Sequence, residues 1–245
     1  MGIPGQSARE EYERRRARDL ARWRARRPWR IAALFGVWIG TYVVVIAITD
    51  GTLEFQGFGR TSAPLFATLA CVRVAADIYR PKSTTEAFRI GAEGEERIGA
   101  ILERFSRRGW IVLHDLALPA GGNIDHLVIT PGGVFTVETK NYSGTVHLEH
   151  RRLHVNGRRK EEHLEQAARQ AEYVRALLAN DERLRNVTVR PIVCYARAKV
   201  KIGFRGGGTL RGIGVGTPSY ALRMIGKSAT GLRFDDLARM RGLLA

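Results

Sequence analysis

The pattern of hydrophobic and polar positions divides this chain of 245 residues into two parts. The first part contains residues 31–49, a run of 19 residues without a charge (IAALFGVWIGTYVVVIAIT). At about 1.5 Å per residue, a helix of this length spans roughly the 30 Å hydrocarbon core of a bilayer. We therefore predict a transmembrane helix at 31–49, and the alternative is a buried helix of a soluble domain.

A second apolar segment at 62–79 has weaker hydropathy. It carries Arg73 and Asp77, which are i,i+4 partners near the end that would re-enter the cytoplasm. Two basic residues follow the segment, whereas the preceding loop at 50–60 has one basic and two acidic residues. This charge asymmetry favours a second span at 62–79 and a hairpin with both ends in the cytoplasm. The alternatives are a single span and an amphipathic helix that lies on the membrane or caps the soluble domain.

The charges that flank the first apolar run predict its orientation. Residues 1–30 contain ten arginines and four acidic residues, and the positive-inside rule keeps such a segment in the cytoplasm. A cleaved signal peptide is disfavoured, because 30 residues precede the apolar run and no small-residue cleavage pattern follows it. We expect a basic cytoplasmic segment at 1–30, a transmembrane region at 31–80 in the cell (inner) membrane, and a cytoplasmic domain at 86–245.

After a short polar linker at 81–86, segments in which hydrophobic residues recur every two positions alternate with segments in which they recur about every 3.6 positions. This alternation of strand-like and helix-like segments predicts a mixed α/β domain. The second and third strands are joined by Pro131-Gly132-Gly133, where glycine supplies the positive φ of a tight turn. A later small hairpin is expected to close around Asn156-Gly157. The expected strands lie at 110–116, 123–130, 134–141, 145–150, 152–155, 187–196 and 212–215, and the expected helices at about 91–106, at 161–179 and in two short C-terminal segments.

Composition excludes several classes of protein. The hydrophobic fraction of 44% is ordinary, and the two cysteines stand outside any Cys-x-x-Cys pattern, so a disordered polyelectrolyte, a disulfide scaffold and a zinc ribbon are excluded. The glycines between 206 and 216 are followed by no Gly-Lys-Ser/Thr sequence, which argues against a nucleotide-binding loop. For His147, His150 and His154 we expect a surface or core role and no specific metal site.

Candidate chemistry lies on the second and third strands. Alternate residues of a strand share a face, so Glu138 and Lys140 point the same way, and Asp125 lies on the neighbouring strand. Paired carboxylates are what Mg²⁺ needs beside a substrate phosphate, and a nearby lysine can orient or deprotonate a water or stabilise developing charge. The alternative is a cross-strand salt bridge on a solvated face.

Several motifs of this region resemble one family. They are GAEGE at 91–95, NIDHLVI at 123–129, PGGVF at 131–135 and ETKNYSG at 138–144. The set is similar to the NERD (nuclease-related) domain, a branch of the PD-(D/E)XK endonuclease-like superfamily whose bacterial members often carry an N-terminal membrane segment. The resemblance implies an α/β fold with a restriction-endonuclease-like core at 91–196, in which helices flank a mixed sheet. A transmembrane helix or helical hairpin would precede this core.

The resemblance also implies roles for single residues. Asp125 and Glu138 would bind Mg²⁺ or Mn²⁺, together with the backbone carbonyl of Thr139. Lys140 would be the catalytic lysine. Glu95, on the first helix of the domain, would be the fourth active-site residue.

The family site also has a glutamine on the helix that follows the strands. Gln170 is the first choice for this role and Gln166, one turn earlier on the same face, is the second. Two positions depart from the family pattern. Asn123 stands where an acidic residue often precedes Ile-Asp, and Thr139 replaces a usual aliphatic residue, but neither change removes a ligand.

The net charge of +16 is distributed unevenly along the chain. Residues 183–233 contain eleven basic residues and no acidic one, whereas residues 81–182 contain 14 basic and 15 acidic residues. The basic segment would attract a phosphate backbone, and the alternatives are anionic lipid or a merely solvated surface. The candidate nucleic-acid contacts are Arg197, Lys199, Lys201 and Arg205, with Arg158, Arg159 and Lys160 as a second wall of the same groove.

Together these features predict a membrane-anchored, Mg²⁺- or Mn²⁺-dependent phosphodiesterase that acts on nucleic acid, with DNA favoured over RNA. The alternative is a non-catalytic module that binds nucleic acid or docks a protein at the inner membrane face. The enzyme is favoured because the three carboxylates and the lysine of the family site are all present.

Overall fold

The computed structural model describes residues 3–50, 56–78, 83–106, 109–203, 205–227 and 231–244. The chain divides into two compact units, of which one is residues 12–86 and the other combines residues 1–11 with 87–245. This division differs from the expected one at the N-terminal end, because the first residues fold with the α/β unit. The physical reason is a set of contacts to the candidate site, which are described below.

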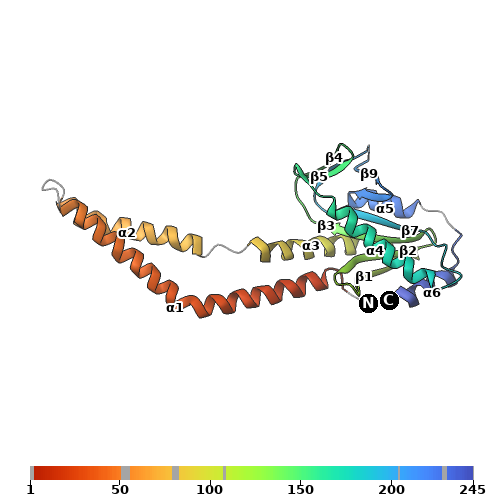
Figure 1. Ribbon diagram of the computed structural model, residues 1–245, viewed down its shortest axis with the longest axis horizontal. Coiled ribbons are helices and arrows are strands. Elements are labelled where there is room, and N and C mark those ends of the chain that lie inside the picture. The colour runs from red at the N-terminus through yellow and green to blue at the C-terminus, as the bar shows by residue number, and fades with distance from the viewer. Residues whose placement is uncertain are drawn as a thin grey trace. The chain divides into compact units, whose positions relative to one another are not determined.

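The described residues of the unit 12–86 are helical (Figure 1). It contains most of α1 (Gln6–Asp50) and all of α2 (Gln56–Ile78), and the Cys71 thiol of α2 donates a hydrogen bond to the Leu34 carbonyl of α1 at 3.3 Å. Residues Ile31–Ile48 have a mean hydropathy of 2.4 and are long enough to cross a membrane. The apolar part of α2 is shorter, Pro64–Ala75. An apolar N-terminal helix is therefore present where it was predicted.

A six-stranded mixed sheet forms the centre of the α/β unit, with the strand order β1-β2-β3-β7-β10-β9. The pairs β1·β2, β2·β3 and β10·β9 are antiparallel, whereas β3·β7 and β10·β7 are parallel. The predicted mixed α/β class is confirmed. The strands are β1 (Ile111–Ala117), β2 (Asn123–Thr130), β3 (Gly133–Lys140), β7 (Val189–Tyr195), β9 (Gly207–Leu210) and β10 (Ile213–Gly216).

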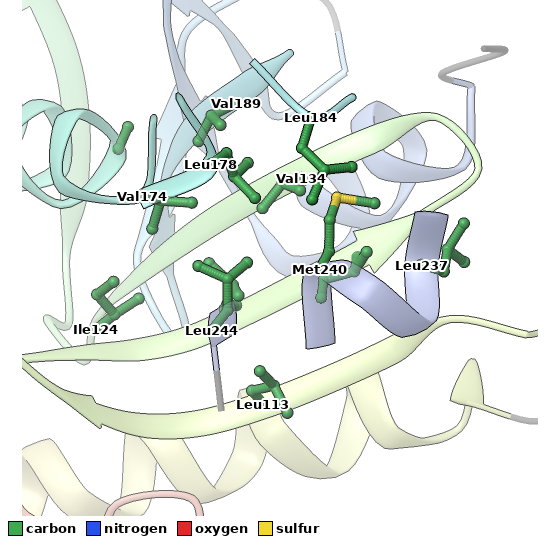
Figure 2. Close-up of a cluster of buried hydrophobic side chains, with 13 residues drawn as sticks. Leu113, Ile124, Val134, Val174, Leu178, Leu184, Val189, Leu237, Met240 and Leu244 are labelled. Carbon is green, nitrogen blue, oxygen red and sulfur yellow. The ribbon is translucent and has the colours of Figure 1, made fainter. Parts of the chain in front are cut away.

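Helices cover both faces of this sheet. On one face α4 (Glu162–Ala179) and α6 (Phe234–Leu244) pack on alternate residues of β1, β2 and β3, and Figure 2 shows Val174, Leu178 and Met240 in this core. On the other face α3 (Ser83–Glu103) and α5 (Pro218–Gly226) pack on the intervening residues, such as Val128, Phe135 and Val137. The runs of consecutive apolar residues in the central strands, such as Leu127–Ile129, therefore follow from burial of both faces.

A second sheet of four short strands has the order β6-β5-β4-β8. Its apolar face shares a core with Leu164 and Ala167 of α4. Its other face is polar and includes His147, His154 and Lys201. The strands are β4 (Thr145–Glu149), β5 (Arg152–Val155), β6 (Arg158–Arg159) and β8 (Lys199–Lys201).

Three expectations about local structure need correction. The hairpin β4·β5 turns at His150 and Arg151, whose φ values of 48° and 61° suit a two-residue turn, whereas Asn156-Gly157 joins β5 to β6. The strands β6, β8 and β9 were not predicted. The linker expected at 81–86 is partly helical, because α3 begins at Ser83.

Candidate active site

The candidate site lies where β2 and β3 separate. Their ladder ends at the pair His126 and Val137, one residue short of Asp125 and Glu138. Beyond this pair the Asp125 side chain takes the place of a strand partner, and its Oδ2 accepts a hydrogen bond from the Thr139 backbone N–H at 2.7 Å. Both carboxylates are almost completely buried, with exposed fractions of 5% for Asp125 and 2% for Glu138.

Lys140 completes the predicted cluster on this face of β3. Its Nζ donates to Glu138 Oε1 at 2.6 Å and to Gln166 Oε1 at 3.0 Å. The expectation that Glu138 and Lys140 point the same way is therefore confirmed.

The two candidate glutamines of α4 both reach the cluster, but they contact different groups. Gln170 Nε2 donates to Glu138 Oε2 at 2.5 Å and to the Asn123 carbonyl at 2.9 Å, and the side chain is 1% exposed. Gln166 is half-buried, and its side-chain oxygen accepts a hydrogen bond from Lys140. Gln170 therefore holds the Glu138 carboxylate from the buried side of the site, whereas Gln166 lies at the side that opens to the pocket.

Glu95 comes to the cluster from α3. The middle of this helix passes the end of β3, where Asn141 Nδ2 donates to the Ile90 carbonyl. Gly94 permits this approach, because a Cβ at this position would lie 2.5 Å from the Asn141 Cβ. Glu95 Oε2 is buried and has no hydrogen-bond partner among the residues that the structure describes.

Burial and mutual repulsion perturb the ionisation of these carboxyl groups. Burial raises the pKa of Glu95 to about 7, and repulsion from Asp115 and Glu138 adds to the shift. Burial and the neighbouring Glu138 and Glu95 also raise the pKa of Asp125 well above its ordinary value, although the Thr139 N–H and Lys140 oppose this. The ionised forms of Glu95 and Asp125 are therefore disfavoured in this site.

Lys140 keeps its charge in this environment. Burial alone would lower its pKa, but attraction to Glu138 and Asp125 and the hydrogen bond to Glu138 outweigh burial. The pKa of Lys140 is therefore raised above 10.5.

A pocket of about 710 Å³ opens onto the cluster. Its floor carries the three carboxylates and Lys140, and its walls are largely apolar or aromatic, with Phe88, Ile90 and Tyr142 among them. Arg197 also lines the pocket. Such a concave site with convergent polar groups and shifted pKa values has the character of an active site.

The N-terminal residues form another part of the pocket wall. Ser7, Ala8 and Glu11 line it, and the Ser7 backbone N–H donates to Asp115 Oδ2 at 2.6 Å. Asn123 Nδ2 donates to Asp115 Oδ1 at 2.6 Å and to Ser7 Oγ at 3.2 Å. The start of β2 is thereby tied to a segment more than 100 residues earlier in the chain. Sequence reasoning missed this contribution, and no local pattern marks it.

Further contacts hold the same N-terminal segment on α3. Arg9 Nη2 lies 2.6 Å from Glu96 Oε1, and Pro4 packs against Gly99 so closely that a Cβ there would lie 2.6 Å from the proline ring. Gly5 has a φ of 72° and meets the Ala92 backbone. The segment is therefore anchored at several points along α3 and β2.

The basic residues proposed for nucleic acid contact are exposed, except the half-buried Lys160, but they are not all close to one another. Arg197 lines the pocket, and Lys199 and Lys201 follow on β8. Arg158 and Arg159 lie on β6, at the opposite edge of the four-stranded sheet. The remaining two predicted residues are Lys160, which pairs with Glu162 at 2.8 Å, and Arg205, whose carbonyl accepts from Arg223 Nη2.

Comparison with known proteins agrees with this geometry. Residues 90–196 match the family model of the nuclease-related domain (NERD). An uncharacterized protein of Bacillus anthracis is 36% identical over 61 residues, and the matched region is 23% of this chain and 29% of that protein. The chain thus spans less than a third of this relative, and no solved structure matches it significantly. Because the buried carboxylates, the lysine and both glutamines all fall within the matched region, we conclude that residues 90–196 of this chain are a nuclease-related domain.

Proposed function

We propose that this protein is a metal-dependent phosphodiesterase that hydrolyses nucleic acid, with DNA as the first substrate class and RNA as the second. The observation that carries the proposal is the convergence of Glu95, Asp125, Glu138 and Lys140 at the floor of one pocket. The nuclease-related family supports a nuclease-like function in general.

The donor set fits a hard divalent cation. Asp125 and Glu138 would hold Mg²⁺ or Mn²⁺ together with the Thr139 carbonyl, and Glu95 offers a buried oxygen that has no partner among the described residues. Burial first and repulsion among the carboxyl groups second raise the pKa values of Glu95 and Asp125, and a bound cation would favour their ionised forms. When bound, such an ion supplies Lewis acidity and an activated water.

The residues around the carboxylates have distinct tasks in this proposal. The Thr139 N–H orients Asp125, and Gln170 orients Glu138 through one of its two oxygens. The Lys140 ammonium, held by Glu138 and Gln166, would stabilise negative charge that develops on the scissile phosphate.

A phosphate backbone would enter from the side of β8. Arg197 is exposed at the pocket, and Lys199 and Lys201 continue from it along one strand. Alternate residues of a strand point to one face, so these two lysines offer a short row of cations that leads to the pocket. Arg158 and Arg159 at the far edge of the same sheet would contact a longer substrate.

The proposal includes a membrane anchor, with the α/β unit at the cytoplasmic side of the cell (inner) membrane. The apolar segment Ile31–Ile48 supports the anchor. Residues 1–11 and 87–245 belong to one unit, so both ends of the intervening segment must lie on the same side of a membrane. If α1 crosses, the chain must therefore return before residue 87, which favours the hairpin over a single span.

The return would use α2. The apolar segment Pro64–Ala75 is shorter than a bilayer core, at about 1.5 Å per residue. The exposed Arg73 lies within it, and a long basic side chain of this kind can snorkel to the membrane surface.

A nuclease assay on the full chain in detergent micelles tests the catalytic proposal. Plasmid DNA, single-stranded DNA and RNA are incubated with Mg²⁺, Mn²⁺ or EDTA, and cleavage is expected only with a metal ion. Lys140→Ala should lower the rate at least about 100-fold, whereas Lys227→Ala, at an exposed position after α5, should leave it unchanged. Cleavage that survives Lys140→Ala would refute the assignment. Binding without cleavage in any metal would favour the non-catalytic docking module.

A further inference from the structure

The polar face of the small sheet carries a second cluster of possible metal ligands. His147 on β4 and His154 on β5 are direct cross-strand partners, and their rings stack with centroids 5.6 Å apart and an interplanar angle of 21°. Glu149 lies two residues after His147, so it shares this face. One ligand atom from each of the three side chains lies within 4.8 Å of the other two. The sequence had suggested no specific metal site here.

The hydrogen bond of His154 determines which of its ring nitrogens is free. Nδ1 lies 3.2 Å from the Arg152 carbonyl oxygen. A carbonyl oxygen only accepts, so Nδ1 is the donor, and in the neutral imidazole Nε2 then carries the lone pair. A backbone carbonyl that holds one imidazole nitrogen in this way is the usual support of a histidine that binds metal through the other nitrogen.

The free nitrogen faces a carboxylate. His154 Nε2 lies 3.6 Å from Glu149 Oε2, which is too long for a hydrogen bond. In a tetrahedral zinc site with bonds of about 2.0–2.1 Å, neighbouring ligand atoms lie roughly 3.3 Å apart. The two electron-rich atoms therefore have about the separation that a shared Zn²⁺ imposes.

We propose that His147, Glu149 and His154 form a binding site for a borderline divalent metal ion, with Zn²⁺ as the first candidate. Two imidazoles and one carboxylate are a ligand set that suits Zn²⁺, whereas Mg²⁺ prefers an all-oxygen set. His147 and His154 are half-buried, and the three ligand atoms all lie within 4.8 Å of one another. The fourth position of the ion stays open to water or an anion.

The surrounding charges shape the properties of this site. Lys201 is the strand partner of His147, Arg159 is the partner of His154, and Arg152 is the partner of Glu149. These three cationic side chains repel a bound metal ion, so an anion in the open coordination position would strengthen metal binding. The site differs in ligand chemistry from the carboxylate cluster at the pocket, and it does not depend on the proposed hydrolysis.

Metal binding to the full chain in detergent micelles tests the inference. Zn²⁺ affinity is measured by competition with a chromophoric chelator, and Co²⁺ binding by its visible absorption, which is strong in a four-coordinate site. We expect His147→Ala and His154→Ala each to weaken Zn²⁺ binding at least about tenfold and to abolish the Co²⁺ band. Glu149→Gln, which keeps the size of the side chain, should weaken binding in the same direction.

Two matched variants distinguish this site from other ones. His150→Asn changes a histidine of the same hairpin outside the cluster, at a φ of 48° that asparagine tolerates, and it should leave binding unchanged. Asp125→Asn changes the pocket and should also leave the Co²⁺ band unchanged. Zn²⁺ affinity that is unaffected by His147→Ala and His154→Ala would overturn the inference. Loss of the band in Asp125→Asn alone would do so as well, because the ion would then belong to the pocket.

Discussion

Glu95 allows a sharp test of the electrostatics of the candidate site. Its pKa is raised from 4.5 to about 7, so the folded state keeps this proton over a range in which the unfolded chain has lost it. The stabilisation that the proton provides is fully present below pH 4.5 and is lost as the pH rises through 7. At about 1.4 kcal/mol per pKa unit, the loss is on the order of 3 kcal/mol above pH 7.

The perturbation is Glu95→Gln, which replaces the carboxyl group by a neutral group of the same size. Two buried histidines act in the opposite direction on the wild-type curve, because burial lowers the pKa of His126 to about 3 and of His163 to about 4. Only the difference between variant and wild type is therefore informative. We expect the variant to become more stable relative to the wild type by about 3 kcal/mol between pH 4.5 and pH 8 in EDTA.

Urea unfolding of the α/β unit is the assay. Trp110, which stacks on Phe105 with ring centroids 4.7 Å apart, becomes its single fluorescence reporter when Trp23, Trp29 and Trp38 are replaced by Phe. The matched control is Glu93→Gln on the exposed side of the same helix, which should stay within about 0.5 kcal/mol of the wild type at both pH values. If the free energy of unfolding of Glu95→Gln differed from that of the wild type by the same amount at pH 4.5 and at pH 8, the reasoning would be refuted.

Three further predictions concern the glutamines, α3 and the membrane region. Gln170→Ala should lower the free energy of unfolding by about 2–4 kcal/mol, because Glu138 Oε2 and the Asn123 carbonyl lose the donor that Gln170 provides. Gln166→Ala should lower it by less than about 1 kcal/mol. Equal losses for the two variants in urea unfolding would contradict this prediction. Gly94→Ala should destabilise the unit by about 1–3 kcal/mol through the contact with Asn141, and Gly91→Ala, where nothing lies within 4 Å, should not destabilise it in the same assay. Protease protection of terminal epitope tags in inverted membrane vesicles should place both chain ends on the same side, and tags on opposite sides would exclude the hairpin.

Much of the candidate site could be predicted, because its central residues lie on two strands joined by a tight turn. The alternation of side chains along a strand places Glu138 and Lys140 on one face, and the register of a hairpin brings Asp125 beside them. From the sequence Gln170 was the first choice and Gln166 the second, since both share a helix face. In the structure both side chains reach the cluster, Gln170 at the Glu138 carboxylate and Gln166 at Lys140.

Other features have no local signal that could have been detected. The strands β8 and β9 are short, and glycine in β9 removes the alternation that identifies a strand. The contacts of Ser7 with Asp115 and Asn123 join residues more than 100 positions apart. The separation of β2 and β3 beyond Val137 depends on the Asp125 side chain replacing a backbone partner.

The attachment of residues 3–11 to the α/β unit also determines how this protein folds and how it can be divided. The residues at 12–86 interrupt a single folding unit, so the pocket wall cannot form until β1 and β2 have been synthesised and the chain has returned. A fragment that begins at residue 87 would lack this wall, and it would leave Glu96 without Arg9 and Asp115 without the Ser7 N–H. A water-soluble form is better made by excision, with a flexible linker that joins Glu11 directly to Ala87, since both residues line the same pocket.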